Sequence, residues 1–86
     1  MSRFEKVLLR LLRGTSDAGF PFDDLRYLLQ HLGFDERIRG SHHIFTRGDV
    51  QEILNLQPRH GESKPYQVRQ VRAVILKYRL GGEDHE

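Results

Sequence analysis

The chain has 86 residues, a formal net charge of +2 and no cysteine. This length accommodates one small domain with a modest core and leaves no room for a second core. The lack of cysteine excludes a disulfide framework, a zinc ribbon and a thiol nucleophile.

The amino-terminal segment is rich in leucine but is interrupted by charges throughout. Residues 1–13 include Arg3, Glu5, Lys6, Arg10 and Arg13. A membrane span needs about 20 mostly apolar residues, and a signal peptide needs a clean apolar stretch followed by a small-residue cleavage site. We therefore expect no membrane association and a cytoplasmic protein.

Two stripes of apolar residues with helical spacing occupy the first part of the chain. The first stripe is formed by Phe4, Val7, Leu8, Leu11 and Leu12, and the second by Phe22, Leu25, Leu28, Leu29 and Leu32. Residues 14–19 indicate a helix stop and a loop between them, and Gly33 stands where a helix commonly ends. Both stripes predict helices whose apolar faces belong to the core.

From Phe34 onward the pattern changes to short strands. Residues 34–39, 41–47 and 51–57 predict three strands, separated by turns at Gly40 and at Gly48-Asp49. A glycine at position 48 can supply the positive φ that a tight hairpin requires. A closing helix is expected to begin near Ser63 to Pro65 and to stop at Gly81-Gly82.

This order of elements predicts an α+β fold. We expect a three-stranded antiparallel sheet with helices packed on one face, in the order αβββα found in double-stranded RNA-binding domains, plus an extra N-terminal helix. Residues 1–20 form the N-terminal extension, residues 21–80 the αβββα domain, and residues 81–86 a disordered tail. The likeness to RNA-binding domains concerns the fold and says nothing of chemistry by itself.

The residues with chemical potential gather in the second half. From Arg37 to Arg79, nine basic residues stand against three acidic ones, a net charge of +6, and the remainder of the chain carries −4. A basic stretch of this kind suits a polyanion, although solvated helix and strand faces explain it equally well. Within it, Gly40-Ser41-His42-His43 precedes a predicted strand, and Pro58-Arg59-His60 follows the next apolar run.

These residue types suit the cleavage of a phosphodiester bond. Histidine, with an ordinary pKa of about 6.5, can take and give a proton near neutral pH, and arginine matches phosphate with a planar fork of donors. RNA carries its own nucleophile, the 2′-hydroxyl. A ribonuclease that uses it needs only a base, an acid and donors that stabilise the phosphorane. His42 can serve as base or acid, with His60 or His43 as the second proton-transfer group.

Alternatives remain for each of these residues. His43 points to the opposite strand face from His42, so a packing or hydrogen-bonding role is as plausible for it as an active one, and without the strand register the two could exchange roles. His60 suits a phosphate contact or a loop scaffold. Ser41 more simply supports the turn with its hydroxyl. Adjacent strand residues diverge and cannot chelate one ion together, so we expect no metal and no cofactor.

The sequence also resembles the HicA toxins of HicA–HicB toxin–antitoxin pairs. The resemblance runs from about Phe22 to Leu80 and is carried by Leu32-Gly33-Phe34, Gly40-Ser41-His42-His43-Ile44-Phe45, Pro58-Arg59-His60-Gly61-Glu62 and the run from Val71 to Leu76. It implies a compact αβββα fold, cleavage of messenger RNA, a cognate antitoxin that covers the nuclease site, and His42 as the catalytic histidine. The leucine-rich segment from Phe4 to Leu12 lies before the region of resemblance.

Together, these observations predict the toxin of a type II toxin–antitoxin pair that acts as a metal-independent endoribonuclease on mRNA. The catalytic residue is His42, with support from His43, His60, Ser41 and Gly40. RNA binding is assigned to Arg39, Arg47, Arg59, Lys64, Arg69 and Arg72. The free toxin is expected to be a monomer that forms a hetero-oligomer with a HicB-like antitoxin. The alternatives are a non-catalytic RNA-binding module or inactive toxin descendant, and a protein-interaction adaptor built on the leucine-rich first helix.

Overall fold

A computed structural model describes residues 1–15 and 17–82 and confirms the α+β class with an additional N-terminal helix. The elements in chain order are α1 (Arg3–Arg13), α2 (Phe22–His31), β1 (Asp35–Arg39), β2 (His42–Arg47), β3 (Val50–Leu56) and α3 (Pro65–Lys77). The strands lie within one residue of their predicted bounds because apolar alternation and the glycine turns mark them locally.

The three strands form one antiparallel sheet in the order β1-β2-β3. The loop between β1 and β2 contains only Gly40 and Ser41, so Arg39 is directly paired with His42. Gly40 has a φ of 59°, as expected for glycine at the first central position of a type II′ hairpin turn. The predicted turn at Gly48-Asp49 is present, but Gly48 does not supply a positive φ, because its φ lies outside the left-handed region. The pairing of β2 with β3 is irregular between Phe45 and Arg47, just before that turn.

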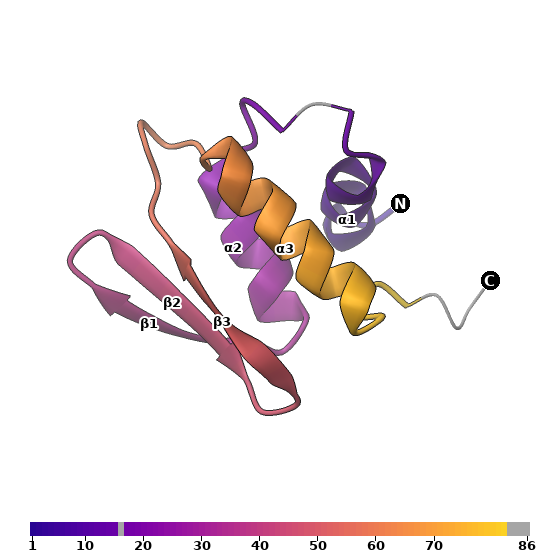
Figure 1. Cartoon of the computed structure of the whole chain (residues 1–86). Helices are drawn as coiled ribbons and strands as arrows, with labels where there is room; N and C mark the ends of the chain where they lie inside the picture. Colours follow the sequence, from indigo (N-terminus) through magenta and orange to yellow (C-terminus); the bar gives the residue numbers. More distant parts are fainter. Residues whose placement is uncertain (16, 83–86) are drawn as a thin grey trace.

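The molecule is layered, with all helices on the same side of the sheet (Figure 1). α2 and α3 lie across one sheet face, and α1 packs on these two helices from the side away from the sheet. The opposite sheet face has no helix over it. Apolar residues from every layer except this open face meet in a single core, whose fully buried members include Leu11, Leu25, Leu28, Phe45, Leu54, Val71 and Ile75.

α1 is fixed at both ends by specific polar contacts. At its start, the hydroxyl of Ser2 accepts a hydrogen bond from the Glu5 amide at 3.2 Å, and the Glu5 carboxylate accepts one from the Ser2 amide at 3.0 Å. Near its end, the guanidinium of Arg72 on α3 donates to the carbonyl of Leu11 at 2.8 Å and pairs with Asp17. The Leu11 carbonyl is one of the helix-terminal acceptors that lack an intrahelical donor, and Arg72 satisfies it.

The chain beyond α3 folds back toward α1 as far as it is described. Gly81 is half-buried, and a side chain there would meet Leu8, Leu12 and Ile75 at 3.7 Å. The remainder of the predicted tail, residues 83–86, lies outside the described residues. Over the described ranges, no helix has the length and apolar character needed to cross a membrane.

Candidate functional site

The two adjacent histidines lie on opposite faces of the sheet. Side chains alternate along β2, so Phe45, which is fully buried, marks the helix-covered face and shares it with His43. His42 therefore lies on the open face, where it is exposed. The alternation expected from the sequence thus separates the two imidazoles, and the structure does not bring them together as one catalytic pair.

His42 is held at the start of β2 by a neighbour on β3. Its Nδ1 atom lies 3.0 Å from the side-chain oxygen of Asn55. Arg39, its register partner on β1, is exposed and lies on the same face of the sheet. Directly opposed residues in an antiparallel pair have Cβ atoms about 5 Å apart. A guanidinium is therefore within reach of any group that the imidazole contacts.

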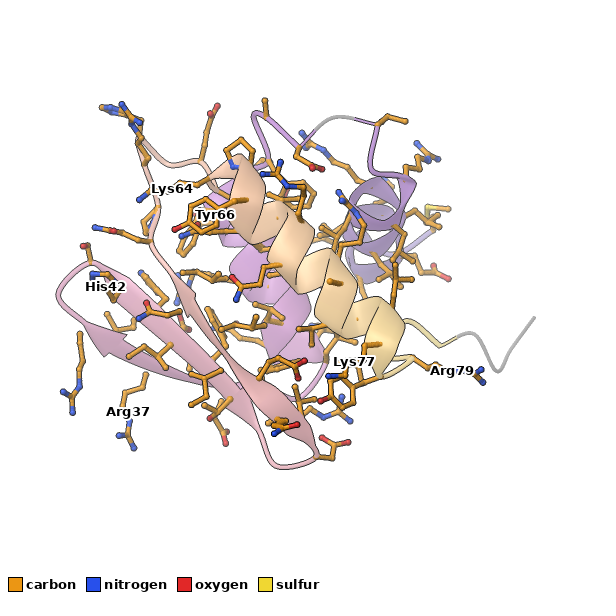
Figure 2. All side chains as sticks on the ribbon, viewed as in Figure 1. Arg37, His42, Lys64, Tyr66, Lys77 and Arg79 are labelled. Carbon is orange, nitrogen blue, oxygen red and sulfur yellow. The ribbon has the colours of Figure 1, made fainter. Side chains whose placement is uncertain are left out.

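A chain of polar contacts links the β1–β2 turn to the start of α3. The side-chain amide of Gln57 donates to the hydroxyl of Ser41 at 2.8 Å, and its oxygen accepts from the Lys64 ammonium at 3.5 Å. Figure 2 shows His42, Lys64 and Tyr66 at the same end of the molecule, whereas Lys77 and Arg79 lie at the other end of α3. The Ser41 hydroxyl is thus connected to the segment after β3, and Lys64 is brought toward the same region.

His43 belongs to a paired network beneath α2. Its Nδ1 lies 2.6 Å from the carboxylate of Glu36, and its ring meets that of Phe22 edge-on at 4.9 Å between centroids. The same carboxylate accepts hydrogen bonds from Arg26 at 2.7 Å and from Gln30 at 2.7 Å. Hydrogen bonds from Arg26, then from His43 and Gln30, lower the pKa of Glu36 to about 2. The Glu36 carboxylate is therefore bound by three side chains of the protein itself.

The other predicted basic residues are dispersed. Arg47 pairs with Asp49 at 3.0 Å at the far end of β2. Arg69 and Arg72 both pair with Asp17, in the loop between α1 and α2, and the Arg72 side chain is only 18% exposed. We therefore leave these three arginines out of the proposed site, because their charges are engaged elsewhere.

Arg59 and His60 lie in a tight turn after β3. The backbone of Arg59 exchanges hydrogen bonds with that of Glu62, and His60 and Gly61 between them have φ values of 53° and 78°. The turn is anchored beside α2, since the Phe22 amide donates to the Gly61 carbonyl at 3.0 Å. Both side chains are exposed, and their contribution to a phosphate contact stays a prediction.

Several site residues were missed by sequence reasoning. Asn55, Gln57 and Glu36 each contact a predicted site residue, and Arg37 lies on the open face two residues before Arg39. Period-two alternation along β1 would have placed Arg37 on the same face as Arg39, but the contacts across strands depend on the register. Within residues 1–15 and 17–82, no group of three or more histidine and carboxylate side chains is placed to hold a metal ion.

Comparison with protein-family models matches residues 22–78 to the family described as the HicA toxin of bacterial toxin–antitoxin systems. Neither the search of curated proteins nor that of solved structures gave a significant match. The matched region begins at the first residue of α2 and ends just after α3. It contains the sheet, His42, Arg39 and Lys64, and leaves α1 outside. Such membership implies a cognate antitoxin as partner. Because the match covers well over half of the sequence, the chain belongs to the HicA toxin family.

Proposed function

We propose that this toxin is a metal-independent endoribonuclease that cleaves mRNA and is neutralised by a HicB-like antitoxin covering the site. The observation that carries the proposal is His42, an exposed imidazole paired across the β1–β2 hairpin with an exposed arginine, inside the family-matched region. An imidazole beside a cation on an open surface suits proton transfer at a phosphodiester. A polymer can reach such a surface without entering a cavity.

The contact with Asn55 sets the protonation pattern of the neutral ring. The amide oxygen of Asn55 can only accept, so Nδ1 of His42 carries the hydrogen of that contact. Nε2 is then left with a free lone pair, which is the form a general base requires. In the proposed step, Nε2 takes the proton of the 2′-hydroxyl, whose oxygen attacks the adjacent phosphorus as the bond to the 5′-oxygen breaks.

Arg39 and Lys64 are proposed to stabilise the negative charge that develops on the phosphorane. Arg39 lies opposite His42 and presents a planar set of donors that fits phosphate oxygens. Lys64 supplies an ammonium group immediately before α3, hydrogen-bonded to the side-chain oxygen of Gln57. Positioned cations of this kind stabilise charge that develops in the transition state. The reaction leaves a 2′,3′-cyclic phosphate and a 5′-hydroxyl, and water or a protonated side chain supplies the proton to the leaving oxygen.

The decisive experiment compares His42→Ala with the wild-type protein and with His31→Gln, which alters an exposed imidazole on α2 away from the site. His42→Ala should lower the RNA cleavage rate by a factor of about 10² to 10⁴, should relieve growth arrest, and should leave the melting temperature and RNA affinity unchanged. His31→Gln should retain full cleavage. The wild-type protein should also cleave RNA in the presence of EDTA, and its products should carry 2′,3′-cyclic phosphate ends.

The same experiment separates the binding-module alternative. A purified protein that binds RNA but cuts none at any pH between 5 and 8, in the range where histidine titrates, would identify a non-catalytic RNA-binding module. Undiminished cleavage by His42→Ala would reject His42 as the catalytic residue. Products with a 3′-hydroxyl would reject the 2′-hydroxyl mechanism, because attack by that oxygen cannot leave such an end.

A further inference from the structure

The open face of the sheet is hollowed beside His42. A shallow depression of about 570 Å³ is lined by residues of all three strands, namely Asp35, Glu36, Arg37, Arg39, Ile44, Thr46 and Ile53, of which Glu36 directs its carboxylate to the covered face. Arg39, the register partner of His42, forms one end of it. The depression is therefore continuous with the proposed catalytic site and extends along β1 away from the β1–β2 turn.

Two guanidinium groups in this depression have no partner among the described residues. In the described part of the chain, neither Arg37 nor Arg39 forms an ion pair or a hydrogen bond through its side chain. Arg26 and Arg47, by contrast, pair with carboxylates at 2.7 and 3.0 Å. Figure 2 shows Arg37 extending from the sheet on the side away from the helices. Unpaired arginines beside a hollow favour an anionic ligand, above all phosphate.

The spacing of the two arginines suits successive phosphates. Residues two apart on a strand lie about 7 Å apart on the same face, and Arg37 and Arg39 are such a pair. This separation resembles that of neighbouring phosphates along an extended single strand. Asp35, two residues further along the same face, ends the cationic stretch with a carboxylate that repels phosphate.

Apolar side chains lie next to these cations. Ile53 on β3 is 63% exposed. Ile44 on β2 is half-buried and is paired with Arg37 on β1 and with Asn55 on β3, which lies two residues from Ile53 on the same open face. An exposed apolar surface bordered by cations matches a nucleotide, whose base can lie on the apolar part while its phosphate meets the charge.

We propose that the open sheet face is an RNA subsite that binds the single-stranded segment adjoining the phosphate to be cleaved. Arg39 contacts the reacting phosphate, Arg37 the neighbouring phosphate, and Ile53 supports the base between them. This inference rests on the proposed function, because it extends the same site beyond His42. It assigns substrate-binding roles to Arg37 and Ile53, neither of which takes part in proton transfer.

The test uses a fluorescent single-stranded oligonucleotide of mixed sequence with 2′-O-methyl groups, which has no free 2′-hydroxyl and therefore stays intact. Its dissociation constant is measured by anisotropy from about 50 to 200 mM salt with wild-type protein and with Arg37→Gln, Ile53→Ala and Arg79→Gln. Arg79 is the matched control, since it is exposed, unpaired in the described residues and at the opposite end of the molecule. Circular dichroism and melting temperature establish that each variant is folded.

Arg37→Gln should weaken binding about tenfold and reduce the slope of log K against log salt by about 0.7, the loss of one phosphate contact on a single strand. Ile53→Ala should weaken binding about threefold without changing the slope, and Arg79→Gln should change neither quantity. Equal effects of Arg37→Gln and Arg79→Gln, no effect of Arg37→Gln, or no binding by wild-type protein would each overturn the subsite. A substitution at Arg37 that weakens only the complex with the antitoxin would overturn it as well.

Failure of the subsite and failure of the proposed function give different results. If Arg37→Gln binds the oligonucleotide like the wild type while His42→Ala abolishes cleavage, the ribonuclease stands and only the subsite is rejected. If His42→Ala cleaves normally, the proposed function is rejected, whatever the affinity of Arg37→Gln.

Discussion

Charged and imidazole side chains are paired with one another on the covered face of the sheet and are largely unpaired, among the described residues, on the open face. On the covered face, Glu36 is bound both by Arg26 of α2 and by His43 of β2. On the open face, Arg37 and Arg39 have no partner among the described residues, and His42 contacts only a neutral amide. Burial explains the difference, since an unpaired charge under a helix loses its hydration without compensation, whereas one facing water does not.

This contrast indicates which groups are available to a ligand. Nδ1 of His43 is hydrogen-bonded to Glu36, and its ring packs edge-on against Phe22, so this imidazole is held in place by the protein. Among the described residues, Nε2 of His42 has no hydrogen-bond partner and the guanidinium of Arg39, its register partner, is unpaired. We infer that the covered face maintains the fold and that the open face carries the activity. Paired substitutions, one on each face, test this division.

The largest difference is expected between two apolar residues. Phe45 points into the core and is fully buried, whereas Ile53 points to the open face and is 63% exposed. Phe45→Ala should lower the free energy of unfolding by about 3–5 kcal/mol, because it removes a buried aromatic ring and leaves a cavity. Ile53→Ala should cost less than about 1 kcal/mol. Urea denaturation measures both values, and similar losses would contradict the assignment of faces.

The next effect concerns acid stability. The pKa of Glu36 is about 2, below its ordinary value of 4.5, because Arg26 and then His43 and Gln30 hydrogen-bond its charged form. A lowered folded-state pKa contributes stability that is fully present above pH 4.5 and is lost as the pH falls toward 2. At neutral pH this contribution is on the order of 2 kcal/mol. Glu36→Gln should remove it and flatten the dependence of stability on pH in that window.

Glu52→Gln is the control for this prediction. The pKa of Glu52 is also about 2, lowered by hydrogen bonds from Lys77 and then Tyr78, but this pair lies at the surface. Solvent screens such a pair, so its removal should flatten the acid limb of the stability curve less than Glu36→Gln does. Thermal melting from pH 2 to pH 7 compares the two carboxylates. An equal or larger effect of Glu52→Gln would contradict a special role for the covered network.

The fold could be predicted from the sequence because its signals are local. Leu25, Leu28 and Leu29 mark the buried side of α2 by their spacing, and Pro65 begins α3 where a proline is favoured. The conformation of the second hairpin could not be predicted. Glycine at position 48 indicated a turn, but the irregular pairing between Phe45 and Arg47 alters the backbone that enters it.

The candidate site could be predicted only in part. The Gly-Ser-His-His run identified His42, since a tight turn followed by a strand is a local feature. The partners of His42 could not be found in this way, because Asn55 is thirteen residues away and meets it only through the register of β2 and β3. Arg72 was assigned to RNA because nothing local reveals its pairing with Asp17, which lies fifty-five residues earlier.

The most direct comparison replaces each histidine of the dipeptide in turn. His43→Ala removes a hydrogen bond to the Glu36 carboxylate and the edge-on contact with Phe22, and it leaves the carboxylate with less compensation under α2. A hydrogen bond to a charged group contributes about 1.5–3 kcal/mol. Because Arg26 and Gln30 remain bound to Glu36, we expect the free energy of unfolding to fall by the lower value of this range, about 1.5 kcal/mol, in urea denaturation at pH 7.

His42→Ala should change the free energy of unfolding by less than about 0.5 kcal/mol, since its ring is exposed. Cleavage by the folded fraction of His43→Ala should persist, so the two variants would separate stability from activity within one dipeptide. Loss of cleavage by a fully folded His43→Ala would contradict this division. It would show that His43, on the covered face, takes part in the reaction itself.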